Sequence, residues 1–492
     1  MVVQDIGATA FRIKLVQTKN LVNGQWIDAD SGATFAVTNP ANDEVIAHVP
    51  NVGQAETTRA IDAAALAKPA WAHRPAHERA TLLRDLARLM RRDTDRLARL
   101  MTLEQGKPLA EARGEIAYAV SFLEWSAEEG KRVYGEIIPA SHADKRILVL
   151  RQPVGVCAVI TPWNFPTAMI TRKLGPALAA GCTVVIKPSE ETPLSAVAIG
   201  ELACEAGIPA GVINIVTGDP ETIGNVLTDD LRVRKLSFTG STAVGQLLVA
   251  KAAKNVMRIS MELGGHAPFI VFDDADIELA VQSAMACKFR NAGQTCICAN
   301  RFYVQAGVYD AFRARLGRAM KDIVVGEGTR EGVQVGPLIN DAAINKVEGH
   351  VENARENGAR VDLGGSRVRL AGLANRFYAP TLIDGLTTDM RMAREETFGP
   401  VAALAVFGDE REIIERANDT EYGLAAYFFT RDASRLMRVA EALDYGIVGA
   451  NDAAPSTAQA PFGGVKRSGI GREGGHHVMD EYTEIKYVSW KL

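Results

Sequence analysis

The chain has 492 residues, with 55 basic and 59 acidic side chains and a formal net charge of -4. This length predicts about two to four structural units, and the near balance of charge argues against a nucleic-acid partner or a membrane-binding patch. Apolar runs such as 154–160 fall far short of the roughly 20 residues that cross a bilayer. The N-terminus lacks a clear signal or transit pattern, and six cysteines do not indicate a disulfide framework. We therefore expect a cytoplasmic protein.

Residues 56–133 alternate Ala- and Leu-rich stretches with Arg, Asp and Glu, and their apolar residues recur at helical spacing. This pattern predicts a helical layer. Between Arg146 and about Phe272 the pattern changes to short apolar runs separated by helical segments: ILVL, VGVCAVI, TVVIK, VINIV, RKLSF and APFIVF. Such runs predict right-handed βαβ units and an open parallel sheet with helices on both faces.

A second alternating α/β region runs from about Ile277 to Val448, and the C-terminal EYTEIKYVSW alternates as a strand does. A terminal strand with little sequence left to cover it leaves an exposed edge. Pairing with another subunit would cover that edge, so we expect an oligomer.

The segments with chemical character follow immediately after predicted strands of the first region. They are TPWNFP (161–166), KPSEETP (187–193), VTGDPET (216–222) and FTGST (238–242). Ligands of open parallel sheets bind beyond the carboxyl ends of the strands, so this placement suits a nucleotide site. The usual GxGxxG fingerprint of such sites is absent.

Three residues in these segments are candidate nucleotide contacts. Ser241 begins a helical run, where free backbone N–H groups attract phosphate, although an ordinary helix cap has the same pattern. Lys187 and Glu190 can hydrogen-bond ribose hydroxyls, although such a pair is also common as a surface ion pair. A carboxylate at position 190 would repel a 2′-phosphate, which favours NAD over NADP.

Three further residues are candidates for covalent chemistry. Cys296, in GQTCICANR, follows a helical pattern and enters a polar, glycine-led segment; it is a candidate nucleophile, although many buried thiols are inert. Glu262, in MELGGH, is a candidate general base if a partly apolar pocket raises its pKa, and a solvated carboxylate otherwise. Asn164 lies between two prolines and can donate to an oxyanion or simply form a tight turn. His266 is expected to be structural or at the surface.

The full set of motifs in this order resembles the NAD(P)-dependent aldehyde dehydrogenases. The motifs are TPWNFP, KPSE, FTGST, MELGG, GQTC, EETFGP (395–400) and PFGGVKRSGIGRE (461–473), and they span nearly the whole chain. The resemblance implies an α/β, aldehyde-dehydrogenase-like fold with a Rossmann-type NAD(P)-binding domain (1–129 and 152–262), an α/β catalytic domain (263–467) and a small β oligomerisation element (130–151 and 468–492). It also implies a homodimer or homotetramer and no metal.

By that resemblance Cys296 attacks the aldehyde carbon to form a thiohemiacetal, and the oxyanion is held by the Asn164 side chain and the Cys296 backbone N–H. Hydride passes to the nicotinamide, and water activated by Glu262 hydrolyses the remaining thioester. Glu473 is a candidate for a proton relay. The cofactor, NAD or NADP, is expected to contact Trp163, Lys187, Ser189, Glu190, Ser241, Glu396 and Phe398.

Within the family the resemblance is to succinate-semialdehyde dehydrogenases, through ITRKLGPALAAGC (170–182) and CKFRNAGQTCICAN (287–300). Arg172 and Arg290 lie there, and paired guanidinium groups bind a carboxylate, although either arginine could be a solvated helix-face charge. Ser456 matches a carboxylate-contacting serine, with Thr457 open as the alternative register, and Phe462 is expected to line the same pocket. The implied substrate is succinate semialdehyde, with glutarate semialdehyde or another ω-carboxylated aldehyde as the alternative.

Cys298 lies two residues after the proposed nucleophile. In some similar enzymes this pair closes a strained, easily reduced disulfide that blocks the site, whereas the simpler interpretation is a small side chain that fills space. Two other classes of protein remain: a non-catalytic structural protein on the same scaffold, which should lack Asn164, Glu262 or Cys296, and an enzyme that transfers the acyl group to coenzyme A, which needs no Glu262.

Overall fold

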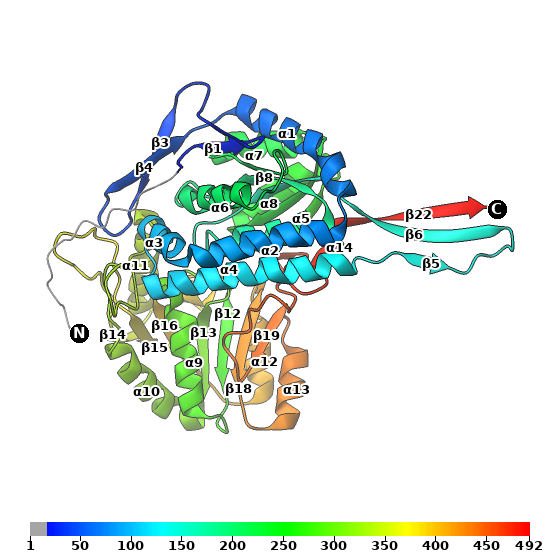
Figure 1. The fold of residues 1–492 in the computed structure, drawn as a ribbon. Helices are drawn as coiled ribbons and strands as arrows, with labels where there is room; N and C mark the ends of the chain where they lie inside the picture. The colour runs from blue at the N-terminus through cyan, green and yellow to red at the C-terminus, as the bar shows by residue number, and fades with distance from the viewer. Residues whose placement is uncertain (1–16) are drawn as a thin grey trace.

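The computed structural model describes residues 17–492 and contains two lobes, each built around one large sheet, with a slender arm that projects from one side (Figure 1). The upper lobe holds an eight-stranded sheet and the lower lobe a seven-stranded sheet. The N-terminal segment 1–16, from which the absence of a signal pattern was inferred, lies outside the described residues.

The eight-stranded sheet has a parallel centre and antiparallel edges. Chain order runs outward from β7, with β8 and β9 on one side and β10 and β11 on the other. The carboxyl ends of β7 and β10 therefore form the topological switch point, where ligands of such sheets bind. The strands, in spatial order, are β2 (Gln25–Ile27), β1 (Asn20–Val22), β9 (Ile213–Ile215), β8 (Thr183–Lys187), β7 (Val156–Ile160), β10 (Val233–Thr239), β11 (Arg258–Glu262) and β21 (Gly469–Ile470).

Helices cover both faces of this sheet because its central strands are apolar on both sides. Successive side chains of a strand point to opposite faces, so Cys157 and Val159 pack in one core cluster while Val156 and Ala158 pack in another. The first cluster includes α5 (Ala168–Ala180) and α6 (Pro193–Glu205); the second includes α1 (Gln54–His73), α7 (Pro220–Asp229) and α8 (Thr242–Ala253). The predicted parallel sheet is confirmed for these strands.

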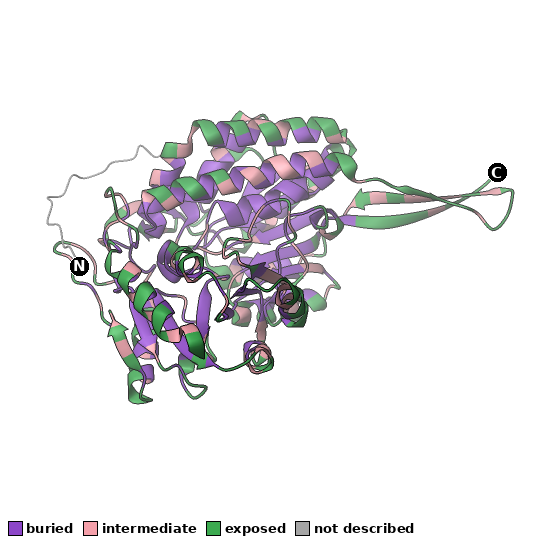
Figure 2. Ribbon diagram, turned by 90° about the horizontal axis from the view of Figure 1, so that it is seen from below, coloured by how far each residue is buried: buried purple, intermediate pink, exposed green. Residues whose placement is uncertain are grey.

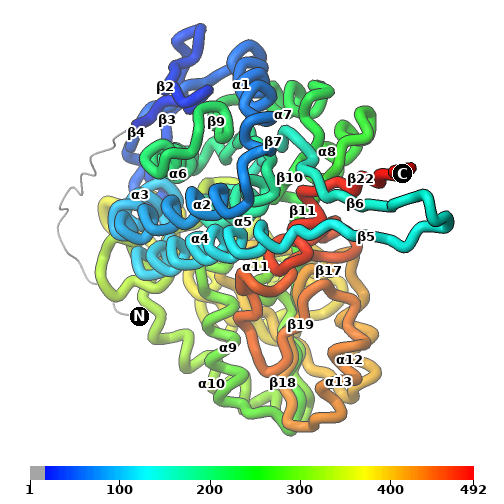
Figure 3. The backbone as a smooth tube through the Cα atoms, turned by 45° about the vertical axis from the view of Figure 1, so that its right-hand side comes forward, coloured from blue at the N-terminus to red at the C-terminus, as the bar shows by residue number. Residues whose placement is uncertain are grey.

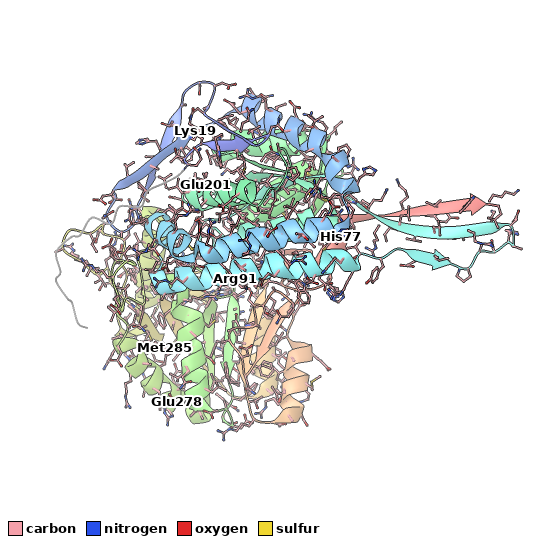
Figure 4. All side chains as sticks on the ribbon, viewed as in Figure 1. Lys19, His77, Arg91, Glu201, Glu278 and Met285 are labelled. Carbon is pink, nitrogen blue, oxygen red and sulfur yellow. The ribbon has the colours of Figure 1, made fainter. Side chains whose placement is uncertain are left out.

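A helical layer packs outside α5 and α6, but it covers only residues 76–129 of the predicted 56–133, because α1 packs with α7 and α8 on the opposite face of the sheet. It consists of α2 (Ala76–Arg92), α3 (Thr94–Gln105) and α4 (Leu109–Glu129). The face of α2 toward the core is apolar and its outer face is charged, so buried and exposed residues alternate along the helix (Figure 2). Glu201 lies on α6 (Figure 4) and pairs with Arg96 of α3 at 3.0 Å.

The seven-stranded sheet is parallel except for its first edge strand. The strands, in spatial order, are β14 (Arg360–Leu363), β15 (Thr381–Asp384), β16 (Val401–Phe407), β13 (Ala299–Gln305), β12 (Ala267–Val271), β18 (Ala425–Phe429) and β19 (Ile447–Ala450). The helices of this lobe are α9 (Ile277–Phe289), α10 (Tyr309–Lys321), α11 (Asp341–Glu356), α12 (Glu410–Asn418) and α13 (Ala433–Ala442). The run APFIVF forms β12 and starts this sheet, so its predicted place in the first sheet was wrong.

Three strands form the arm: β5 (Glu136–Ile138), β6 (Lys145–Pro153) and β22 (Thr483–Lys491). β22 pairs with β6 along its whole length and has no partner on its other side within the described chain, which confirms the predicted terminal edge (Figure 3). The run ILVL lies in β6, so its assignment to the parallel sheet was wrong; an apolar run specifies a strand but not its partner. Ile137 and Ile485 on the arm are 80% and 65% exposed.

Short elements complete the fold. They are the paired strands β3 (Thr34–Thr38) and β4 (Val45–Pro50), the paired strands β17 (Tyr422–Gly423) and β20 (Val465–Lys466), the helix α14 (Val478–Glu481), and the 3-10 turns η1 (Gly130–Arg132), η2 (Arg290–Gly293), η3 (Ala306–Val308) and η4 (Arg391–Ala393). Residues 469–470, which the sequence places in the oligomerisation element, form β21 and pair with β11. Across residues 17–492, the structure has no helix with the length and apolar character needed to traverse a bilayer.

Candidate active site

One cavity of about 530 Å³ collects side chains from both sheets and from α4. The eight-stranded sheet contributes the loops after β7 and β10, and the seven-stranded sheet contributes the loops before β13 and β16. The cavity therefore lies at the switch point identified above, and its volume falls within the usual range for small-molecule sites.

The loop that carries Cys296 reverses direction through three consecutive left-handed residues. Asn291, Ala292 and Gly293 have φ values of 51°, 55° and 75°. A side chain at Gly293 would place its Cβ 2.2 Å from the carbonyl oxygen of Gly399, so only glycine fits there. The turn directs Cys296 into the cavity, as the sequence predicts for a nucleophile.

Burial sets the resting state of the Cys296 thiol. Removal from water raises its pKa to about 12, and the nearby positive charge of Arg172 only partly opposes that rise. The thiol is therefore protonated at neutral pH in the free protein. Attack on a carbonyl carbon requires that this proton move to another group.

Asn164 lies at the carboxyl end of β7, next to the nucleophile loop. Its side chain is buried, lines the cavity and donates from Nδ2 to the carbonyl oxygen of Gln294 at 3.1 Å. The backbone N–H of Cys296 has no hydrogen-bond partner among the described residues. An amide donor and an orphan backbone donor thus lie beside the thiol, which is the arrangement that an oxyanion site needs.

Glu262 ends β11 and is 3% exposed. Burial raises its pKa well above the usual carboxyl range, and the negative charge of Glu473 adds to that rise. Its Oε2 atom has no hydrogen-bond partner within residues 17–492. Glu262 lies behind the cavity wall rather than in its lining, next to Gly463, where an added Cβ would come within 2.9 Å of Oε1.

Arg172 projects from α5 into the cavity and is 2% exposed. Its guanidinium carbon lies 3.9 Å from the centroid of the Phe462 ring, and its Nε lies 2.9 Å from Oε2 of Glu473. Its Nη2 has no hydrogen-bond partner within the described chain. Because an unsatisfied buried donor is costly, this atom is suited to a ligand anion.

Arg290 and Ser456 line the same cavity as Arg172, which the sequence anticipates. Arg290 follows α9, is exposed, and stacks over Phe165 at 5.2 Å. Ser456 shares a short hydrogen bond with the phenol of Tyr118. Thr457 instead bonds Gln459 and does not line the cavity, which favours Ser456 over the alternative register.

Glu473 is buried beneath the arginine. It pairs with both Arg172 and Lys173. Burial opposes its ionisation, but the charges of Lys173 and Arg172 overcome this and lower its pKa. The pKa values of the neighbouring carboxyls of Glu473 and Glu262 are therefore shifted in opposite directions, a combination that suits a proton relay.

The expected cofactor contacts fall into two groups. Trp163, Ser241, Glu396 and Phe398 line the cavity. Within this group, Ser241 caps α8, Glu396 accepts from the Gly265 N–H at 3.2 Å, and the rings of Trp163 and Phe398 meet edge to face at 5.6 Å. The second group, Lys187, Ser189 and Glu190, follows β8 and lies outside the cavity lining.

These residues fit a nicotinamide nucleotide. Nζ of Lys187 lies 2.9 Å from Oε2 of Glu190, so donors and acceptors for ribose hydroxyls are side by side. Gly240 and Ser241, which line the cavity, lead into α8, and the first-turn N–H groups of a helix are donors suited to phosphate. Burial raises the pKa of Glu396 to about 7, although its bond from Gly265 opposes that rise.

Cys298 and His266 are not part of the cavity lining. Cys298 is 3% exposed, and its Sγ lies 3.6 Å from the carbonyl oxygens of Lys288 and Ala299. A disulfide with Cys296 stays a prediction. His266 is fully buried, which excludes the surface interpretation and leaves the structural one.

Helix α4 contributes lining residues that the sequence interpretation missed, namely Glu111, Gly114, Glu115 and Tyr118. Glu111 is followed after three and four residues by Gly114 and Glu115, and these are followed after four and three residues by Tyr118, so the set lies on one helix face, which was the available signal. It was missed because the segment was interpreted only as a structural layer.

Comparison with known proteins agrees with this site. Residues 26–488 match the family described as "Aldehyde dehydrogenase family". The chain belongs to the aldehyde dehydrogenase family and is an NAD(P)-dependent oxidoreductase, which confirms the family and fold class predicted from the sequence.

Several relatives are similar over nearly their whole length. "Succinate-semialdehyde dehydrogenase (NADP(+)) GabD" of Escherichia coli (strain K12) is 56% identical over 474 residues, which cover 96% of this chain and 98% of that protein. "Glutarate-semialdehyde dehydrogenase" of Pseudomonas putida is 55% identical over 475 residues, with coverage of 96% and 98%. Among solved structures, betaine aldehyde dehydrogenase from Staphylococcus aureus in complex with NAD+ has a TM-score of 0.94 at 37% identity, and the match covers 96% of this chain and 95% of that one.

Proposed function

We propose that this enzyme oxidises an aldehyde that carries a carboxylate at its far end, with succinate semialdehyde oxidised to succinate as the preferred reaction. The observation that carries the proposal is the shared cavity of the Cys296 thiol and the two arginines, Arg172 and Arg290. A thiol alone would suit any aldehyde, whereas guanidinium groups in the same cavity select an anionic one. The similarity to succinate-semialdehyde and glutarate-semialdehyde dehydrogenases supports this substrate class.

In the proposed mechanism the Cys296 thiol gives up its proton to a water molecule, and the sulfur adds to the aldehyde carbon to form the oxyanion of a thiohemiacetal. The side-chain amide of Asn164 and the Cys296 backbone N–H stabilise the oxyanion. When bound, the nicotinamide nucleotide supplies the acceptor for the hydride that leaves this carbon. Glu262 then removes a proton from water, which hydrolyses the thioester and releases the acid.

The opposite pKa shifts of the two buried carboxyls, Glu262 and Glu473, support these roles. The raised pKa of Glu262 makes its carboxylate a stronger base than a solvated one, which suits a general base. Glu473 and Lys173 form the candidate path along which that proton leaves. The nucleotide would be held by Trp163, Lys187, Ser189, Glu190, Ser241, Glu396 and Phe398.

We further propose NAD as the preferred nucleotide. Burial raises the pKa of Glu190, but the neighbouring Lys187 outweighs this and lowers it, so the carboxylate is charged. A charged carboxylate beside the ribose disfavours a 2′-phosphate. NADP is the alternative, because the Escherichia coli relative is named for NADP(+). Assays with both nucleotides distinguish the two.

The exposed edge and apolar side chains of the arm support a homodimer or homotetramer built through β22. We also propose the domain boundaries inferred from the sequence: an NAD(P)-binding domain (1–129 and 152–262), a catalytic domain (263–467) and an oligomerisation element (130–151 and 468–492).

Transfer of the acyl group to coenzyme A is the second catalytic candidate, and the presence of Glu262 disfavours it.

The deciding experiment is a panel of aliphatic and ω-carboxylated aldehydes of two to seven carbons, each assayed with NAD and with NADP and with or without coenzyme A. We expect the largest kcat/KM for the four-carbon ω-carboxylated aldehyde with NAD, and free acid as the product. Equal kcat/KM for charged and uncharged aldehydes of the same length would overturn the proposed substrate class.

A further inference from the structure

A buried ion pair joins Glu115, which lines the cavity, to Lys107, which lies outside that lining. Lys107, in the turn between α3 and α4, contacts Oε2 of Glu115 on α4, and both side chains are 1% exposed. The cost of burying two charges largely offsets their attraction, so such a pair contributes little net stability. The hydrogen bonds that the pair makes to neighbouring main-chain groups therefore indicate its role.

The ammonium of Lys107 holds the main chain of the Asn164 loop. Nζ of Lys107 donates to the carbonyl oxygen of Asn164 at 2.7 Å and lies 4.0 Å from the centroid of the Phe165 ring. These two contacts fix the loop from behind. They leave the Asn164 side chain to face the cavity and the nucleophile loop.

The other end of the ion pair holds the start of α5. Oε1 of Glu115 accepts hydrogen bonds from the backbone N–H groups of Thr167 at 2.9 Å and Ala168 at 3.1 Å. A carboxylate is favoured at a helix N-terminus, where it satisfies free N–H groups. Because α5 carries Arg172, one ion pair connects the Asn164 loop with the helix of the proposed carboxylate-binding arginine.

The nucleophile loop is tied to the same carbonyl oxygen. Nδ2 of Asn291 donates to the carbonyl oxygen of Asn164 at 2.9 Å and to that of Gln294 at 3.2 Å. The backbone N–H of Asn291 donates in turn to Glu111 of α4 at 2.7 Å. The carbonyl of Asn164 is thus the point where α4, the Asn164 loop and the Cys296 loop are joined.

We infer that Lys107 and Glu115 are positioning residues that hold the oxyanion donor of Asn164 in register with the Cys296 thiol. Lys107 lies outside the cavity lining and acts through the Asn164 main chain, whereas Glu115 lines the cavity and acts through the start of α5. The inference rests on the proposed oxyanion role of Asn164. Its physical basis is that a displacement of about 1 Å in a catalytic donor costs on the order of 100-fold in rate.

The test removes the Lys107 contact while keeping the fold. Lys107→Met alone would leave Glu115 buried without its cation, so the informative variant is Lys107→Met/Glu115→Gln. Methionine fills the space of the lysine stem, and glutamine still accepts from the start of α5. We expect the pre-steady-state burst of reduced nucleotide to slow about 10- to 100-fold, with charged and uncharged aldehydes alike and with unchanged nucleotide affinity. Lys107→Arg retains the cation and should keep the burst rate closer to that of the parent.

A matched control is available in α3. Glu104 is also fully buried and accepts the Leu194 and Ser195 N–H groups, both at 2.8 Å, at the start of α6, which carries no proposed site residue. Glu104→Ala should lower the unfolding temperature and leave the burst rate at saturating nucleotide unchanged. An equal slowing in Glu104→Ala, or a burst of parental rate in the Lys107→Met/Glu115→Gln variant, would overturn the inference.

A separate variant distinguishes this failure from failure of the proposed mechanism. Asn164→Ala should slow the burst at least as much as the Lys107→Met/Glu115→Gln variant does. If Asn164→Ala is slow and the double variant is fast, only the positioning inference is wrong. If Asn164→Ala retains the parental burst, the proposed oxyanion role of Asn164 is wrong as well.

Discussion

The most selective test of the substrate proposal is the replacement of Arg172 by methionine. Methionine keeps much of the apolar packing over the Phe462 ring, from which the guanidinium lies 3.9 Å. The substitution removes the free Nη2 donor and also one of the two cations that pair with Glu473. The second effect acts on every aldehyde, so the difference between a charged and an uncharged substrate isolates the first.

The magnitude follows from the burial of Arg172, which is 2% exposed. A hydrogen bond to a charged group contributes about 1.5–3 kcal/mol, and each 1.36 kcal/mol is about tenfold in rate. We therefore expect kcat/KM for the ω-carboxylated aldehyde to fall about 10- to 150-fold more than kcat/KM for an uncharged aldehyde of equal length. Arg290 is exposed, and an exposed pair is worth about 0–1 kcal/mol, so Arg290→Met should give a difference of about fivefold or less.

The assay is initial-rate kinetics for the two aldehydes with the parent, Arg172→Met and Arg290→Met, with thermal unfolding as the control for folding. A parallel loss for both aldehydes in Arg172→Met would refute the reasoning, because it would assign the arginine to holding Glu473 alone. If Arg290→Met lowers kcat/KM for the charged aldehyde, relative to the uncharged one, more than Arg172→Met does, then the greater burial of Arg172 does not make its contact the stronger one.

The remaining predictions concern the thiol, the base, the nucleotide and oxidation. Cys296→Ala should abolish oxidation with nucleotide affinity unchanged, as measured by fluorescence titration. Glu262→Gln should give a burst of reduced nucleotide followed by slow turnover, and absence of a burst would point to a different role. Because burial raises the pKa of Glu262 well above the usual carboxyl range, kcat of the parent should rise with pH as this carboxyl loses its proton, and the variant should lose that rise. Glu190→Gln should improve kcat/KM for NADP relative to NAD by about two- to fivefold, the range of an exposed charge interaction. Cys298→Ala should remove the thiol-reversible part of inactivation by peroxide, and an unchanged reversible part would exclude the predicted disulfide.

The positions of the site loops could be predicted from the sequence because parallel strands end at a common edge. Asn164 follows β7, Lys187 ends β8 and Ser241 follows β10, as their apolar runs indicate. The membership of each strand in a sheet was less predictable. The run ILVL pairs with β22, whose residues lie more than 300 positions later, and no local pattern encodes such a distant partner.

The polar contacts within the site show the same limit. Arg172 and Glu473 are both present in recognisable motifs, but their pairing depends on how the C-terminal segment folds back over α5. Glu115 and Tyr118 follow ordinary helical spacing, and only the packing of α4 shows that these two residues line the cavity. The sequence therefore predicted candidate residues better than it predicted their partners.

The site combines groups from separate bodies of the fold, and this explains why it contains so many buried polar contacts. Asn164 and Arg172 belong to the eight-stranded lobe, whereas Cys296 and Glu396 belong to the loops of the seven-stranded lobe. Apolar packing is non-directional, so it tolerates small sliding motions between packed surfaces. Hydrogen bonds such as that from Asn164 to Gln294 have narrow distance and angle limits and do not. The alignment of nucleophile and oxyanion donor should therefore depend on these few polar bonds, while the stability of the two lobes depends on their separate apolar cores.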